Sequence, residues 1–163
     1  MIGAALLTIA LFAPQVVVEN ATPEQEAIIR DAWALTLDTY SHQGCDTPKG
    51  IKVKVTGPNF PSAARYYEPG ELSAKAKVKI NPFYVYDWVL VHEFGHHWNA
   101  ICNSDTQRDA YTAALGAACW TCGTHSERPH EIWAEDFRIG AGVNGPGNND
   151  PSPGYGLLWG WYG

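Results

Sequence analysis

The stretch VLVHEFGHHWNAI, residues 89–101, lies within a strongly apolar segment from about 85 to 101 whose spacing predicts a buried helix. It contains the pentapeptide His92-Glu93-Phe94-Gly95-His96. Residues four apart on a helix lie about 40° apart around its axis, so the imidazoles of His92 and His96 project from one face. The stretch therefore predicts a helix that presents two ligands to one metal ion.

The residues around these two histidines add to the prediction. Glu93 lies beside them, where a carboxylate can take a proton from a metal-bound water. Gly95 costs about 1 kcal/mol relative to alanine inside a helix, which predicts the close approach of a second helix at this point. His97 lies about 140° from His92 around the axis, so we expect it to point elsewhere and not to bind the metal.

A second stretch, EIWAEDFR at residues 131–138, offers the third ligand that a catalytic zinc site needs. Glu131 and Glu135 share one face of the predicted helix, and the small Ala134 lets this helix sit close to Gly95. The alternatives are a chance spacing of the two histidines and a solvated face for the two acids. A solvated face does not explain the apolar residues between the acids, so the two stretches together favour a metal site.

In combination, the two stretches resemble the gluzincin metallopeptidases, and most closely the catalytic domain of the anthrax lethal factor type. Members of that family carry the same pentapeptide and a later Glu-x-x-Ala-Glu-x-Phe-Arg helix. The resemblance implies a minimal zincin-like domain in which His92, His96 and Glu131 bind one zinc ion, Glu93 is the general base, and Glu135 orients a ligand histidine. It implies a zinc endopeptidase that acts on a peptide or protein substrate.

The resemblance also implies that the strand before the active-site helix, near residues 74–80, lines the cleft and pairs with an extended peptide. The alternative is that its alternating lysines protect a sheet edge from aggregation. The chain departs from the family in having no tyrosine shortly before the glutamate helix. The candidates for the oxyanion-stabilising or proton-donating group are therefore His125, His130, Tyr111 and Tyr155.

Around these stretches the pattern predicts an α+β fold in the order helix, strands, helices. The tetrapeptide TPEQ at 22–25 reads as a capped helix start and predicts a helix over 23–40. Apolar residues that alternate with lysines predict strands over 51–55 and 74–80, in a small, mostly antiparallel sheet.

Two more helices are expected, one from Asp105 to Leu115 and one that Ser126 caps and that runs to Ile139. No repeat or long linker divides the chain. We expect a single domain over 1–163 with a loop-rich tail over 140–163.

Eleven Lys and Arg against 17 Asp and Glu give the chain a formal net charge of −6. No basic surplus exists to neutralise phosphates, which argues against nucleic acid as the main partner. The apolar run over 1–13 is shorter than the roughly 20 residues that span a bilayer, so we expect no stable membrane insertion. Residues 1–20 are either a secretory signal or an apolar first element of the fold. We expect a monomer.

The four cysteines predict two disulfides and, with them, a secreted or extracytoplasmic protein; they are Cys45, Cys102, Cys119 and Cys122. The Cys119-Trp120-Thr121-Cys122 segment is alternatively a redox pair or half of a structural zinc site. Two other functions therefore stand beside the peptidase. One is a non-catalytic, zinc-stabilised module that binds a protein through the lysine strand at 75–79, and the more distant one is a thiol-disulfide oxidoreductase. Glu93 favours the enzyme, because a structural metal site needs no base.

Overall fold

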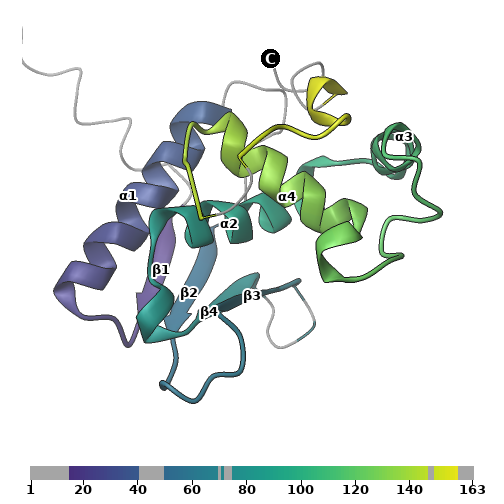
Figure 1. Cartoon of the computed structure of the whole chain (residues 1–163). Coiled ribbons are helices and arrows are strands. Elements are labelled where there is room, and N and C mark those ends of the chain that lie inside the picture. The colour runs from purple at the N-terminus through teal and green to yellow at the C-terminus, as the bar shows by residue number, and fades with distance from the viewer. Residues whose placement is uncertain (1–14, 41–49, 70, 72–74, 147–148, 158–163) are drawn as a thin grey trace, which may run out of the picture.

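The computed structural model describes residues 15–40, 50–69, 71, 75–146 and 149–157, and the α+β class predicted from the sequence is confirmed (Figure 1). The elements follow one another as β1 (Val16–Glu19), α1 (Pro23–Tyr40), β2 (Ile51–Val55), β3 (Ala64–Tyr67), β4 (Lys77–Ile80), η1 (Pro82–Tyr84), α2 (Asp87–Cys102), α3 (Asp105–Ala114), η2 (His125–Glu127) and α4 (Pro129–Gly140). The η elements are single 3₁₀ turns. Helices follow strands along the chain, as predicted.

The sheet is mixed, and the expectation of a mostly antiparallel sheet is wrong. Its strand order is β1-β2-β4-β3. The β1/β2 and β2/β4 pairs are parallel, and only β3 runs antiparallel to its neighbour. Parallel strands need a crossover connection, which α1 supplies between β1 and β2. Between β2 and β4 the chain turns back through β3, a four-residue strand that the lysine alternation did not predict.

This order changes the place of the lysine strand. β4 lies between β2 and β3, so it is an interior strand and not the edge that the sequence predicted. The edge beside α2 is β3, and it is β3 that packs against this helix. The protection of an exposed edge therefore does not explain the lysines of β4.

The helix boundaries agree with the predictions except at two starts. Asp105, predicted to cap α3, is its first residue, and Ser104 is the cap. Thr22 and Gln25 cap α1 reciprocally, with Thr22 N–H 3.0 Å from Gln25 Oε1 and Gln25 N–H 3.3 Å from Thr22 Oγ1. Ser126, predicted to cap the glutamate helix, lies instead in η2, and α4 begins three residues later at Pro129. The first turn of a helix tolerates proline because its N–H groups have no partner within the helix.

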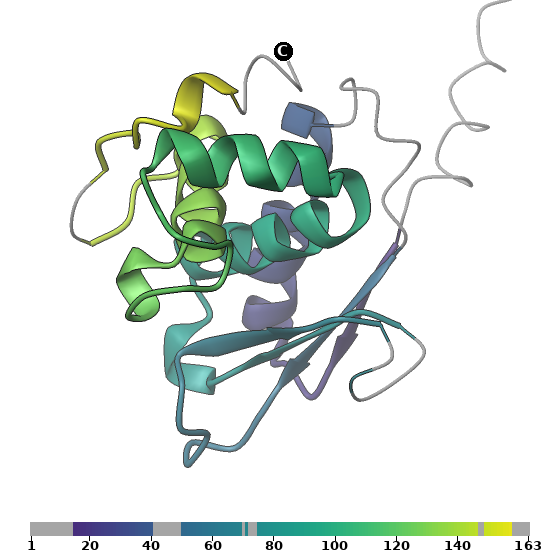
Figure 2. The ribbon, with the colours of Figure 1, turned by 90° about the vertical axis from the view of Figure 1, so that its right-hand side faces the viewer.

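All four α-helices lie on one side of the sheet (Figure 2). The sheet packs its inner face, including Val53 and Val78 at 0% exposure, against this helical layer. Within the layer α2 packs against α1 and α4, and it also packs against β3 of the sheet. α2 and α4 pack closely at Gly95, as predicted, because an added Cβ there would lie 3.1 Å from the Cα of Ala134.

The segment that follows α4 is hydrogen-bonded to that helix through Asp136. The carboxylate of Asp136 accepts hydrogen bonds from the hydroxyl of Tyr111 at 2.5 Å and from the backbone N–H of Ser152 at 2.9 Å. Asp136 is 1% exposed, so its oxygens depend on these donors. Gly154 lies directly against the ring of Tyr111, where an added Cβ would come within 2.5 Å of a ring carbon. Part of the predicted loop-rich tail is therefore packed structure.

Among the residues that the structure describes, none belongs to a helix long and apolar enough to cross a bilayer. Residues 1–14, which hold the whole apolar run over 1–13, lie outside the described part of the chain.

Candidate metal centre

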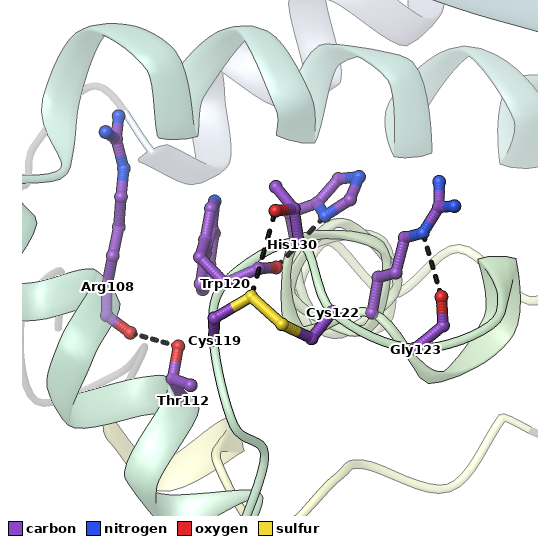
Figure 3. Close-up of a disulfide and its surroundings, with 9 residues drawn as sticks. Arg108, Thr112, Cys119, Trp120, Cys122, Gly123 and His130 are labelled. Carbon is purple, nitrogen blue, oxygen red and sulfur yellow. Dashed lines mark hydrogen bonds between the residues drawn. A yellow bond between two sulfur atoms is a disulfide. The ribbon is translucent and has the colours of Figure 1, made fainter.

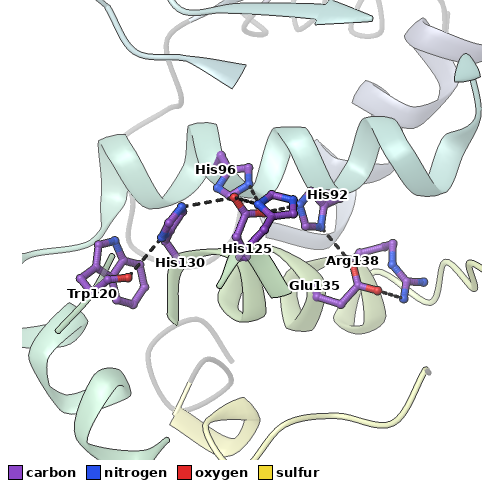
Figure 4. Close-up of polar contacts among 8 residues, drawn as sticks. His92, His96, Trp120, His125, His130, Glu135 and Arg138 are labelled. Atoms are coloured by element: carbon purple, nitrogen blue, oxygen red, sulfur yellow. Dashed lines mark hydrogen bonds and ion pairs between the residues drawn. The ribbon is translucent and has the colours of Figure 1, made fainter. Parts of the chain in front are cut away.

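The two predicted stretches meet across the contact between α2 and α4. His92 and His96 on α2 and Glu131 on α4 each offer a ligand atom, and these three atoms lie within 4.8 Å of one another. Oε2 of Glu131 is 3.3 Å from Nε2 of His92 and 3.4 Å from Nε2 of His96. The predicted ligand set is thus brought together. Figure 4 shows the imidazoles of His92 and His96 gathered in this region.

These separations fit a shared ion better than direct ion pairs. Two ligand atoms that are each about 2.0–2.1 Å from a tetrahedral zinc ion lie about 3.3–3.4 Å apart. A charge-assisted hydrogen bond between an imidazole and a carboxylate is about 2.7–2.9 Å long. The donor set also suits zinc, because two imidazoles and one carboxylate leave a fourth position for water.

Glu135 lies one helical turn beyond Glu131 on α4 and contacts the Nδ1 side of the His92 ring. Its Oε2 is 3.0 Å from Nδ1 of His92, and its Oε1 accepts a hydrogen bond from the buried guanidinium of Arg138 at 2.5 Å (Figure 4). A proton on Nδ1 leaves the lone pair of Nε2 free for a metal. Although burial favours the neutral acid, the hydrogen bonds from His92 and Arg138 hold the pKa of Glu135 at about 2.

The two histidines of α2 differ in charge when no metal is bound. Burial opposes protonation of His92, but its contacts with Glu131 and Glu135 raise its pKa to about 9. Burial lowers the pKa of His96 to about 4, even though this ring also contacts Glu131. A metal ion must therefore displace a proton from His92 at neutral pH, whereas His96 is already neutral.

Glu93 is 8% exposed and lines the same cavity as the ligand set. Burial raises its pKa to about 7; the charge of His92 opposes this shift and that of Glu131 adds to it. The backbone N–H of Tyr66 on β3 also hydrogen-bonds to Glu93. A carboxylate whose pKa lies near neutrality can both accept and return a proton, as general acid–base catalysis requires.

Two of the four predicted oxyanion candidates lie at the centre. Nδ1 of His125 and Nε2 of His130 are 3.3 Å and 3.2 Å from Oε1 of Glu131, the carboxylate oxygen that does not face the α2 histidines. The other two are elsewhere: Tyr111 donates to Asp136, and neither Tyr111 nor Tyr155 lines the cavity. His125 and His130 are therefore the candidates that the geometry retains.

His97 points away from the centre, as predicted. It is 0% exposed, and its Nδ1 lies 3.2 Å from the hydroxyl of Tyr66. The ring of Tyr66 also stacks against His96, with centroids 6.3 Å apart. Sequence reasoning missed Tyr66, because it lies in a short strand that has no alternating pattern.

The cavity at this centre has a volume of about 1010 Å³ and runs between β3 and the segment before α4. Residues 62–66 line one wall, and Trp120, His125 and His130 line the other. Its floor is the face of α2 that carries the two histidines.

A disulfide shapes the second wall. Cys119 and Cys122 are bonded to each other, which is one of the pairings that the four cysteines allow; Cys45 lies outside the described residues. The carbonyl of Trp120, inside this small loop, accepts hydrogen bonds from the backbone N–H of His130 at 3.3 Å and from its ring Nδ1 at 3.2 Å. Figure 3 shows Arg108, Trp120 and His130 extending in the same direction, toward α2.

Comparison of this chain with models of protein families, with curated proteins and with solved structures gives a plain result. None of the three finds a match.

Proposed function

We propose that this protein is a zinc-dependent endopeptidase. The observation that carries the proposal is the convergence of His92, His96 and Glu131 at separations suited to one tetrahedral ion, with Glu93 beside them in an open cleft. A structural zinc site is usually closed by four protein ligands, whereas three ligands at a cavity are typical of a catalytic one. The likeness of both stretches to gluzincin motifs points the same way.

Each residue has a role in this proposal. His92, His96 and Glu131 hold one zinc ion per chain, which when bound polarises a peptide carbonyl and acidifies a water molecule. Glu93 accepts the proton of that water and later delivers it to the departing amine. Glu135 fixes the tautomer of His92 through Nδ1, and Arg138 keeps Glu135 ionised and in place.

His130 is the best-placed group to stabilise the oxyanion. The Trp120 carbonyl accepts a hydrogen bond from its Nδ1, so its Nε2 can donate when the ring is protonated. The contact of Nε2 with Glu131 favours that state, because it raises the pKa of His130. His125 is the second candidate, but its side chain is 79% exposed and so loses more freedom when it acts. A positioned donor of this kind contributes about 10²–10³-fold to the rate.

The substrate is an extended peptide that pairs with β3 and not with β4. β3 is the sheet edge at the cleft, and Ala64 and Tyr66 both line the cavity. One side of β3 pairs with β4. The backbone N–H of Tyr66 is directed to Glu93, so β3 also presents a backbone group to the site. Backbone pairing on an open edge is a general way to hold an extended chain.

A secreted or extracytoplasmic location fits the Cys119–Cys122 disulfide, because such bonds persist in oxidising compartments. A monomer with no nucleic-acid partner remains the prediction for the assembly.

The deciding experiment combines metal analysis with cleavage of a peptide library. The parent protein should hold one zinc per chain and cleave members of the library, and Glu93→Gln should keep the zinc but lose at least about 10²-fold in kcat/KM. Glu24→Gln, an exposed glutamate at the start of α1, is the matched control and should behave as the parent. Protein that binds zinc but cleaves nothing would favour the binding module, and protein that takes up no zinc would refute both readings.

A further inference from the structure

The face of the sheet that points away from the helices is strongly basic. Side chains alternate across a sheet, and the buried positions such as Val53 and Val78 mark the inner face. The strand register then places five cations together on the outer face: Lys52, Lys54, Arg65, Lys77 and Lys79. We refer to these five residues as the basic face. They are five of the eleven Lys and Arg in a chain whose net charge is −6.

Like charges lie directly opposite one another within the basic face. Lys52 pairs with Lys77, Lys54 with Lys79, and Arg65 with Lys79. Such pairs destabilise a sheet. Among the outward positions of the four strands only Glu19 is acidic, and it contacts Lys52 at 2.6 Å. Five cations and one acid leave 5 − 1 = +4 on this face.

The usual reason for lysines on a sheet is absent here. Lysines on an edge strand prevent the sheet from pairing with another chain. β2 and β4, which carry four of the five cations, are both interior strands. Solubility alone is served by mixed charges spread over the surface. The like-charge pairs cost stability on interior strands, where neither edge protection nor solubility explains them. This indicates that the basic face binds a negatively charged partner.

The composition of the face indicates which kind of anion it fits. Four of the five cations are lysines, whose flexible point charges suit diffuse negative charge, whereas arginine suits phosphates held in a fixed geometry. Among the outward positions of the four described strands the only aromatic side chain is Tyr67, and its ring is occupied, because Arg65 and Lys79 lie 5.1 Å and 5.0 Å from its centroid. Tyr67 is therefore not free to stack on a nucleic-acid base.

One end of the face has a hollow of small-molecule size. A cavity of about 480 Å³ is bordered by Lys54 and Lys79 together with Asn20, Val55, Thr56, Gly57 and Phe60. Two ammonium groups and a hydroxyl can surround the phosphate and carboxylate of one lipid headgroup, and an extended polyanion needs no such hollow. We propose that the basic face docks the protein on the surface of an anionic lipid bilayer, with headgroups entering this hollow.

Docking in this way leaves the metal centre accessible. The outer face of the sheet and the helical layer lie on opposite sides of β2 and β4 (Figure 2), and the cleft opens between β3 and the helices. Glu68 and Glu71 line the cleft and would be repelled by the membrane surface. The proposal does not depend on the peptidase activity.

The test is co-sedimentation of the full chain with vesicles of phosphatidylcholine alone and with vesicles that also contain phosphatidylserine. We expect binding to the second kind only, and its loss in 0.5 M salt, which screens surface charges. Each lysine near an anionic surface contributes about 5-fold to binding. Lys54→Gln should therefore weaken binding about 5-fold, and Lys54→Gln with Lys79→Gln about 25-fold.

Arg30→Gln is the matched control, because it removes one positive charge from α1 in the helical layer and should leave vesicle binding unchanged. The double lysine variant relieves a like-charge pair, so it should fold, which a thermal melt will check. Equal binding to neutral vesicles, no binding to either kind, or equal losses in the lysine variants and the control would each overturn the proposal. Binding to single-stranded RNA or polyglutamate, but not to anionic vesicles, would assign the face to a polyanion instead.

Discussion

Gly95 and Ala134 bring α2 and α4 into backbone contact: a Cβ on Gly95 would lie 3.1 Å from the Cα of Ala134 and 3.2 Å from the side chain of Phe137. This contact lies one helical turn from Glu131 and directly beside His96 along the chain. The two residues therefore set the distance between the proposed metal ligands of the two helices.

Gly95→Ala should weaken zinc binding by about 10-fold without unfolding the protein. The added methyl must push α4 by a few tenths of an ångström, and the roughly 1 kcal/mol that alanine gains in a helix offsets the crowding. Gly57→Ala is the control, because its Cβ would meet no atom within 4 Å. Chelator competition and thermal melts measure the two effects. Unchanged zinc affinity in Gly95→Ala would show that the ligand distance is set elsewhere.

Zinc affinity should rise with pH between about 6 and 9. His92 is protonated below a pKa of about 9 in the metal-free protein, and zinc must displace that proton. The apparent affinity then increases by up to about tenfold per pH unit, and calorimetry in buffers of different ionisation enthalpy should count about one proton released. Glu135→Gln removes a contact that raises the pKa of His92. The zinc affinity of this variant should therefore stop rising at a lower pH than that of the parent.

The same ionisation predicts how the stability of the metal-free protein changes with pH. The pKa of His92 is raised on folding, so its contribution to the free energy of unfolding is fully present below about 6.5 and is lost as pH rises toward 9. Burial raises the pKa of Glu93 to about 7, so the contribution of Glu93 to the free energy of unfolding changes below about pH 7. Between pH 7 and 9 the melting temperature should fall without metal. Zinc-loaded protein should lack this fall, and its persistence there would contradict the prediction.

Glu131 and Glu135 should differ in what they contribute. Glu131→Ala removes a metal ligand and should reduce zinc affinity by more than about 100-fold, while Glu135→Ala should reduce it by about 10 to 100-fold, the usual effect of losing a group that orients a ligand. Competition against a chelator ranks the two variants. The opposite ranking would mean that Glu135 is the ligand.

His130 should matter more for turnover than the other oxyanion candidates. His130→Ala should lower kcat by about 10²-fold or more, and His125→Ala by less, because the exposed His125 is not held by a second contact. Tyr111→Phe removes a donor to Asp136 and should lower the melting temperature while kcat stays the same. A kcat loss in Tyr111→Phe equal to that in His130→Ala would refute the assignment.

The helices of this protein could be predicted from local sequence, and its sheet order could not. Caps, prolines and apolar spacing act within a few residues, and they indicated α1 and the two helices of the site. Strand order depends on which distant segments pair, and the four residues of β3 have no pattern that predicts their place. The misplacement of the sheet edge followed from missing this strand.

The proposed histidine ligands and the pair of glutamates were predictable because their spacing on each helix already fixes a common face, and the choice of Glu131 over Glu135 as the ligand came from the resemblance. Glu93 and Glu135 followed from their positions beside those ligands. Arg138 was within reach of the same reasoning, since it lies three residues from Glu135 on the same helix. Tyr66 and Trp120 were not, because they reach the site only through the folding of a strand and a disulfide loop.

The hydrogen bond between Asp136 and Ser152 fixes α4 to the segment that follows it. Asp136 follows Glu135 directly on α4, so this helix is held on one side by the histidines and on the other by the chain beyond residue 150. A protease that cuts within that later segment, or a fusion that displaces it, would remove the Ser152 donors of this buried carboxylate and leave it the hydroxyl of Tyr111. The position of α4, and with it that of the Glu131 and Glu135 carboxylates, thus depends on a segment whose described residues do not line the cavity of the candidate site.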